Sequence, residues 1–155
     1  MSDKGAKGER TDASGSFIQE FMEKRGFKVI FYEVISDDLE IIVEKLAQVC
    51  DEMHPDLILT SGGTGFSARD NTPEATLEVV NKIVPGIPEA IRYYGLQITP
   101  QAMLSRAVAG IRGKTLIVNL PGSVKGVRES LEPILKPLLH GLDILKANSS
   151  ECGQE

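Results

Sequence analysis

The chain has 155 residues, of which 41% are hydrophobic and 25% charged, as in one ordinary globular domain. Its formal net charge of −5 argues against a nucleic-acid partner, because binding nucleic acid needs a positive field that displaces counterions from phosphates. No apolar run approaches the ~20 residues of a membrane span, and the N-terminus lacks the apolar core of a signal peptide, so we expect a cytoplasmic protein with no membrane partner.

The first half of the chain predicts helices and strands in alternation. A polar cap followed by apolar residues at helical spacing indicates a helix, and a short apolar run indicates a buried strand. These patterns predict, in order, a helix over residues 15–25 capped by Ser14, a strand over 27–35, a helix capped by residues 36–38 that ends before Pro55, a strand over 57–60 and a helix from Pro73 to about Val80.

The second half predicts a short helix, a hairpin and a long helical stretch. Pro88 opens a helix that ends near Gly95, and residues 107–111 and 115–120 read as paired strands. Residues 124–145 are mainly helical, with interruptions expected at two prolines. Strands alternating with helices favour a three-layer α/β/α sandwich with a mostly parallel sheet. We expect a single domain over residues 1–147, followed by a polar tail over 148–155.

A glycine-rich loop follows the second predicted strand and is the strongest functional signal. Glycine tolerates positive φ, which lets successive backbone N–H groups converge into a site for an oxyanion such as phosphate. Downstream, Arg69 adds a fixed cation, and Asp70 adds a carboxylate able to hold a divalent metal against phosphate oxygens. The candidate phosphate-binding residues of the loop are Gly62, Gly63, Thr64 and Gly65.

Three polar turns follow three of the predicted strands. They contain Asp37, the loop from Gly62 to Asp70, and residues 121–123. Ligands of open α/β sheets bind beyond the carboxyl ends of the strands, so we expect these turns to meet in one pocket. A local cluster of cations between Arg106 and Arg128 could add further donors for an anion.

Two segments match nucleotide-binding motifs in sequence but lack the predicted structural context that each motif needs. Residues 63–68 fit the dinucleotide fingerprint, but no helix begins directly after these glycines. Residues 113–115 read Gly-Lys-Thr, as at the end of a P-loop, yet strand formers follow them where a P-loop needs a helix. The two histidines have no metal-ligand spacing and no Ser or Cys partner at a recognisable motif, so we interpret them as structural. The two cysteines do not make a disulfide framework.

Four segments together resemble one known family. They are SDKGAKGERTDASG, TSGGTGFSARDNTPEAT, PGIPEAIR and LSRAVAGIRGKTLIVNLPGS, and they span nearly the whole chain. The chain is similar to the molybdopterin adenylyltransferases of molybdenum-cofactor biosynthesis, the MogA/MoaB group. The resemblance implies a three-layer α/β sandwich that forms a homo-oligomer, a trimer or hexamer, and that hands its product to a molybdate-inserting enzyme.

The resemblance also implies the reaction and the roles of residues. Magnesium-ATP would adenylylate the terminal phosphate of molybdopterin and release pyrophosphate. By this mapping Asp37 and Asp70 are catalytic and hold Mg²⁺, while the glycine loop binds phosphate. The remaining substrate-binding positions that the resemblance implies are Arg69, Glu89, Ser105, Arg106, Pro121, Gly122 and Ser123.

The chain departs from the family at two points. Family members begin with an apolar strand that runs into the Ser-Asp turn, and this chain starts at that turn, so we expect a sheet that lacks the family's first strand. Val124 stands where the family often has proline, which suggests a looser turn at Ser123. The alternative function is a molybdopterin-binding protein of the same fold with little or no catalysis.

Overall fold

The computed structural model describes Met1 and residues 11–147. The helices are α2 (Ala13–Glu23), α3 (Leu39–Gln48), α4 (Thr72–Val79), α5 (Gly86–Leu96) and α6 (Val124–Ala147), with a π-helical turn η1 (Val49–Met53) and a 3₁₀ turn η2 (Pro100–Leu104). The strands are β1 (Leu57–Ser61), β2 (Lys82–Ile83), β3 (Ala109–Arg112) and β4 (Thr115–Leu120).

The strands form one mixed sheet in the order β1-β4-β3-β2. β1 and β4 are parallel, with Leu57 opposite Leu116, whereas β3 is antiparallel to both of its neighbours. The predicted hairpin is therefore confirmed as β3 and β4. The sequence suggested a mostly parallel sheet, whereas among the described strands one pair is parallel and two pairs are antiparallel. One reason is that β2, which has two residues, is too short to give a periodic pattern.

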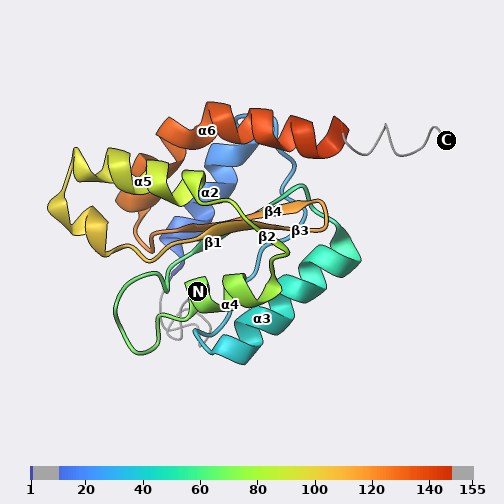
Figure 1. Cartoon of the computed structure of the whole chain (residues 1–155), viewed down its shortest axis with the longest axis horizontal. Coiled ribbons are helices and arrows are strands. Elements are labelled where there is room, and N and C mark those ends of the chain that lie inside the picture. The colour runs from blue at the N-terminus through green and yellow to red at the C-terminus, as the bar shows by residue number, and fades with distance from the viewer. Residues whose placement is uncertain (2–10, 148–155) are drawn as a thin grey trace.

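Helices cover both faces of the sheet, which confirms the three-layer α/β/α sandwich (Figure 1). The side chains of a strand alternate between its two faces, and β4 is buried along its whole length. Leu116, Val118 and Leu120 pack with α2, α5 and α6, whereas Ile117 packs with α3 and α4. The central strand thus joins two hydrophobic cores, one on each face of the sheet.

Helix α6 differs from the sequence prediction because it continues through Pro133 and Pro137. A proline inside a helix costs about 3 kcal/mol. The helix buries five large apolar side chains at helical spacing, each stabilising it by about 1.5–3 kcal/mol, and this burial offsets both prolines. These side chains are Val127, Leu131, Ile134, Leu138 and Leu142.

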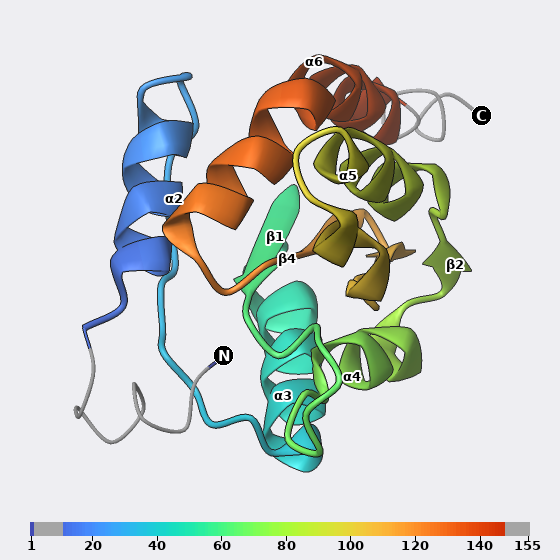
Figure 2. The ribbon, with the colours of Figure 1, turned by 90° about the vertical axis from the view of Figure 1, so that its left-hand side faces the viewer.

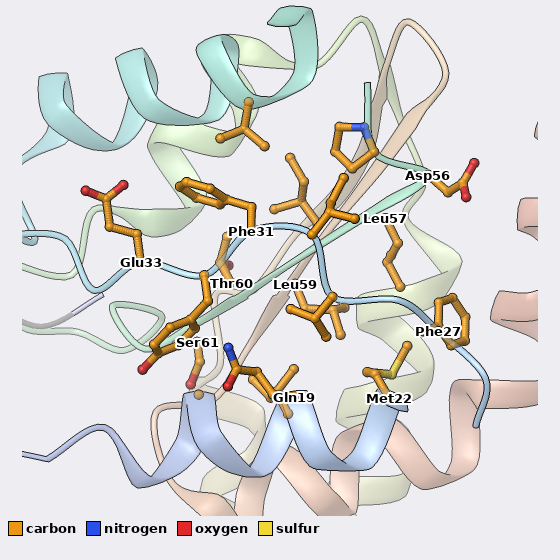
Figure 3. Close-up of a pocket in the computed structure, with 18 of the residues that line it drawn as sticks. Gln19, Met22, Phe27, Phe31, Glu33, Asp56, Leu57, Leu59, Thr60 and Ser61 are labelled. Carbon is orange, nitrogen blue, oxygen red and sulfur yellow. The ribbon is translucent and has the colours of Figure 1, made fainter. Parts of the chain in front are cut away.

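The strand predicted over residues 27–35 is absent, so that prediction was wrong. The segment is extended, but no backbone hydrogen bond joins it to β1 within the described part of the chain. Ile30, Phe31 and Tyr32 stay 41–49% exposed. A cavity of about 610 Å³ separates the segment from β1 (Figure 3). Met22 of α2 and Leu46 of α3 are among the residues that line it.

The edge of β1 that faces this cavity has no strand beside it among the described residues. In a parallel ladder both backbone groups of every second residue face the same neighbour. The Asp56 carbonyl and the Gly62 amide bond to β4, so the backbone groups of Leu57, Leu59 and Ser61 face the cavity. The gap agrees with the expected lack of the family's first strand, and it explains why residues 27–35 have no ladder partner.

Candidate functional site

The glycine loop begins directly after β1, where the chain must turn sharply. Gly62 and Gly63 have φ values of +91° and +65°, which residues with a Cβ rarely adopt. A Cβ on Gly122 would lie 3.3 Å from the Gly62 Cα, so the two turns are in close contact. The Ser61 hydroxyl also donates a 2.9 Å hydrogen bond to the Pro121 carbonyl.

The Asp37 turn lies on the other side of the same loop. The Asn71 side-chain amide donates to the Asp37 carbonyl at 2.9 Å. A Cβ on Gly63 would come within 3.5 Å of an Asp37 carboxylate oxygen, and one on Gly65 within 2.9 Å of an Asp70 carboxylate oxygen. The three polar turns therefore converge, as the sequence predicted, and two carboxylates flank the glycines. Figure 2 shows the loop that joins β1 to α4 beside the chain that leads into α3.

The carbonyl groups of the loop are bound on its inner side. The Gly62 carbonyl accepts from the Thr72 hydroxyl at 2.9 Å and the Gly63 carbonyl from the Thr72 amide at 3.2 Å. The Thr64 carbonyl accepts from the Arg106 amide at 2.9 Å. Within the described residues, no acceptor bonds the amides of residues 63–66, so a row of backbone donors remains available to an anion.

Asp70 closes the far end of the loop. One of its carboxylate oxygens accepts the Ser67 amide at 2.8 Å, and its own amide donates to the Ser67 carbonyl at 2.9 Å. This turn fixes the carboxylate beside Gly65. No group of three or more His, Cys, Asp or Glu side chains gathers around a common point in the described ranges.

Three other predicted site residues, Arg69, Ser105 and Glu89, lie at different places relative to the three turns. The Arg69 guanidinium is half exposed and lies 3.9 Å from an Asp38 carboxylate oxygen. Ser105 precedes Arg106, and its carbonyl accepts a 3.2 Å hydrogen bond from Arg92. Glu89 is exposed on the first turn of α5, and no hydrogen bond links its side chain to the three turns in the described structure.

The N-terminus of α2 also borders the site, which the sequence reasoning missed. Asp12, and not Ser14, caps this helix, because its carboxylate accepts the Gly15 amide at 2.9 Å. The Ser14 hydroxyl instead donates to the Gly122 carbonyl at 2.8 Å. A cavity of about 290 Å³ lies here, lined by Ser14, Ser61, Gly122 and Ser123 among others. The Asp-Ala-Ser-Gly run was the available signal.

Two shifted pKa values mark the polar surroundings of Asp12. Burial and a 2.9 Å hydrogen bond to the Asp12 carboxylate raise the pKa of Tyr32 to about 12. Burial lowers the pKa of the Met1 amino group, although Asp37 and Asp12 act in the opposite direction. That amino group donates to the Ser61 carbonyl. The carboxylates of the Asp37 turn and of the α2 N-cap therefore both act on the amino group that bonds the end of β1.

Sequence comparison now assigns the chain to a family. The profile of the family described as a probable molybdopterin binding domain matches residues 1–141. The chain belongs to this family. A molybdopterin adenylyltransferase of Helicobacter pylori is 40% identical to this family member over 156 residues, covering 99% of this chain and 89% of the relative.

Solved structures of similar proteins show the same fold. The molybdopterin biosynthesis enzyme MoaB of Thermus thermophilus superposes with a TM-score of 0.88 at 49% identity, covering 94% of this chain and 92% of its own. The tungsten cofactor synthesizing protein MoaB of Pyrococcus furiosus superposes with a TM-score of 0.82 at 34% identity, covering 93% of this chain and 91% of its own.

Within the described residues, none of the helices is long and apolar enough to cross a membrane.

Proposed function

We propose that this protein is a molybdopterin adenylyltransferase that acts in molybdenum-cofactor biosynthesis. Family membership and the curated relatives of that name support the assignment. In the proposed reaction, an oxygen of the terminal phosphate of molybdopterin attacks the α-phosphorus of ATP. The bond to the β-phosphate breaks, and pyrophosphate leaves.

The convergence of three turns around unbonded backbone amides carries this proposal. A triphosphate needs several donors at fixed positions, and the amides of residues 63–66 would supply them directly after β1. The Pro121, Gly122 and Ser123 turn forms the facing wall, because Gly62 and Gly122 are in contact. Arg69, Glu89 and Ser105 complete the proposed substrate-binding set.

Mg²⁺ fits the carboxylates that flank the loop. This ion usually takes one or two carboxylates together with substrate phosphates, and it rarely occupies a cage made only of protein ligands. Asp37 and Asp70 lie on either side of the glycines, and no larger acidic cluster occurs among the described residues. Asp70 and Asp37 would hold the ion, and the ion would neutralise charge on the triphosphate.

The proposed chemistry depends on position and charge, with little covalent work by the protein. The attacking group is already an anionic phosphate oxygen, so no general base is needed. The backbone donors would hold the nucleotide phosphates, and the Asp37 and Asp70 carboxylates would hold the metal, so that the reacting atoms are aligned before the bond changes. Rigid donors then stabilise the charge of the transition state without reorganising.

A direct assay tests the proposal. Purified protein is mixed with molybdopterin, ATP and Mg²⁺, and pyrophosphate release is followed. We expect release only when molybdopterin is present, with adenylyl-molybdopterin as the second product. Binding of the pterin without pyrophosphate release would contradict the proposed activity and identify a binding protein. We further propose that the protein acts in the cytoplasm as a homo-oligomer and passes its product to a molybdate-inserting enzyme.

A further inference from the structure

Arg106 makes three hydrogen bonds to the loop from Gly62 to Asp70. It follows η2 and precedes β3, so it reaches the loop from a distant part of the chain. Its backbone amide bonds the Thr64 carbonyl at 2.9 Å, and its Nε donates to the Gly65 carbonyl at 2.6 Å. One Nη donates to the Asp70 carbonyl. Arg106 therefore binds both ends of the turn that leads from the glycines to Asp70.

Glu74 holds the remaining arm of this guanidinium. The other Nη of Arg106 forms an ion pair with Oε1 of Glu74, on the first turn of α4. The Oε2 atom of Glu74 is buried and accepts no hydrogen bond from the described residues. Each of the three guanidinium nitrogens thus has an acceptor in the protein, and the planar fork of arginine fits this arrangement where a lysine ammonium does not.

These bonds have a consequence for the direction of the backbone amides. The carbonyl of one residue and the amide of the next point to opposite sides of the planar peptide group that they share. The Thr64 and Gly65 carbonyls point toward Arg106, because they accept its hydrogen bonds. The amides of Gly65 and Phe66 must therefore point away from Arg106. The hydroxyl and amide of Thr72 bind the carbonyls of the two preceding peptide groups in the same way.

We propose that Arg106, oriented by Glu74, is a positioning residue that holds the loop in its anion-binding shape. It differs from the expected role of a cation that contacts the substrate, because its nitrogens bind loop carbonyls and Glu74. Glu74 belongs to this clamp although it lies outside the predicted site. The inference rests on the proposed function only for its effect on catalysis, since the clamp shapes the loop without substrate.

Hydrogen exchange of the ligand-free protein tests the clamp. In Arg106→Lys, which keeps the charge but loses the fork, we expect the hydrogen-bonded amides of Ser67, Asp70 and Thr72 to exchange at least 10-fold faster than in the wild type. We expect the same direction in Glu74→Ala. Wild-type exchange in both variants would overturn the proposal, and Glu74→Ala provides the answer if Arg106→Lys does not fold.

Arg112→Lys is a matched control at the other end of the sheet. Arg112 also forms an ion pair, at 2.7 Å with Asp51, and also donates to a carbonyl, that of Val79 at 2.8 Å. We expect Arg112→Lys to leave exchange at the amides of Ser67, Asp70 and Thr72 unchanged. Acceleration in the control equal to that in Arg106→Lys would mean a general loss of stability and would contradict a local clamp.

Steady-state kinetics then separate positioning from direct contact. We expect Arg106→Lys and Glu74→Ala to lower kcat/KM for ATP by at least 10-fold, while Arg112→Lys retains it. Full activity in Arg106→Lys with normal loop exchange would show that charge alone is needed and would overturn the clamp. If the wild type releases no pyrophosphate, the proposed function fails, but the exchange experiment still decides the clamp.

Discussion

At the scale of single residues, the site depends on where a few polar atoms are held. Asp70 illustrates this, because a turn with Ser67 fixes its carboxylate beside Gly65. The charge of the carboxylate is the part that a metal would use. The amide of asparagine is nearly the same size, so replacing Asp70 removes charge with little change of shape.

We predict that Asp70→Asn lowers kcat by roughly 10²-fold, as expected when one preorganised electrostatic element is lost. The melting temperature should stay close to that of the wild type, because the asparagine side-chain oxygen can still accept the Ser67 amide. Pyrophosphate release and thermal unfolding provide the two measurements. Asp143→Asn, on an exposed position of α6, is the control and should retain activity. Wild-type turnover in Asp70→Asn would remove this residue from the mechanism.

The sequence predicts the types of site residue better than their contacts. The glycines and Asp70 lie together because they are close in the chain, and loop chemistry alone could predict that. Arg106 reaches Gly65 across 41 residues, and no local pattern shows whether an arginine binds a substrate or a carbonyl of its own chain. The contact between Ser14 and Gly122, 108 residues apart, was missed for the same reason.

At the scale of elements, periodicity predicted the helices and the hairpin well. It failed at residues 27–35, where an apolar run forms no strand. Such a run has the propensity of a strand, but strand pairing requires a neighbour with free backbone groups at the right distance. A sequence pattern shows the strand propensity of residues 27–35 but does not show whether another strand lies beside them. Here a cavity lies between this segment and β1.

The exposed state of this segment predicts an unusual tolerance to substitution. We expect Ile30→Ala, at a site that is 49% exposed, to change the free energy of unfolding by less than about 0.5 kcal/mol. Ile117→Ala, at a fully buried site on β4, should cost about 2–5 kcal/mol. Urea denaturation measures both. A cost above about 2 kcal/mol for Ile30→Ala would mean that the segment is packed against β1 in solution.

At the scale of the whole molecule, several apolar side chains are exposed along α5 and the turns that follow it. Tyr93, Ile98 and Met103 are 63%, 52% and 62% exposed. Apolar patches on soluble proteins commonly mark contacts with other proteins. We therefore predict that this region joins the subunits of the proposed homo-oligomer.

We predict that Met103→Glu weakens self-association, because a charge would have to be buried in the subunit contact. Sedimentation velocity at micromolar concentration should show a shift toward the monomer. The control is Ile144→Glu on α6, a residue of similar hydrophobicity that is 48% exposed and lies outside this region, and it should sediment like the wild type. An unchanged assembly in Met103→Glu would place the contact elsewhere.

The pairing of β1 with β4 has a consequence for biosynthesis of the chain. Leu57 meets a partner, Leu116, that is synthesised 59 positions later. At about 5–20 residues per second, the ribosome delivers that partner only after an interval of seconds. A nascent polypeptide that ends before Arg106 contains every glycine of the loop. It still lacks Arg106, which bonds the loop carbonyls, and Gly122, which lies against Gly62. The loop therefore takes its anion-binding shape only late in translation.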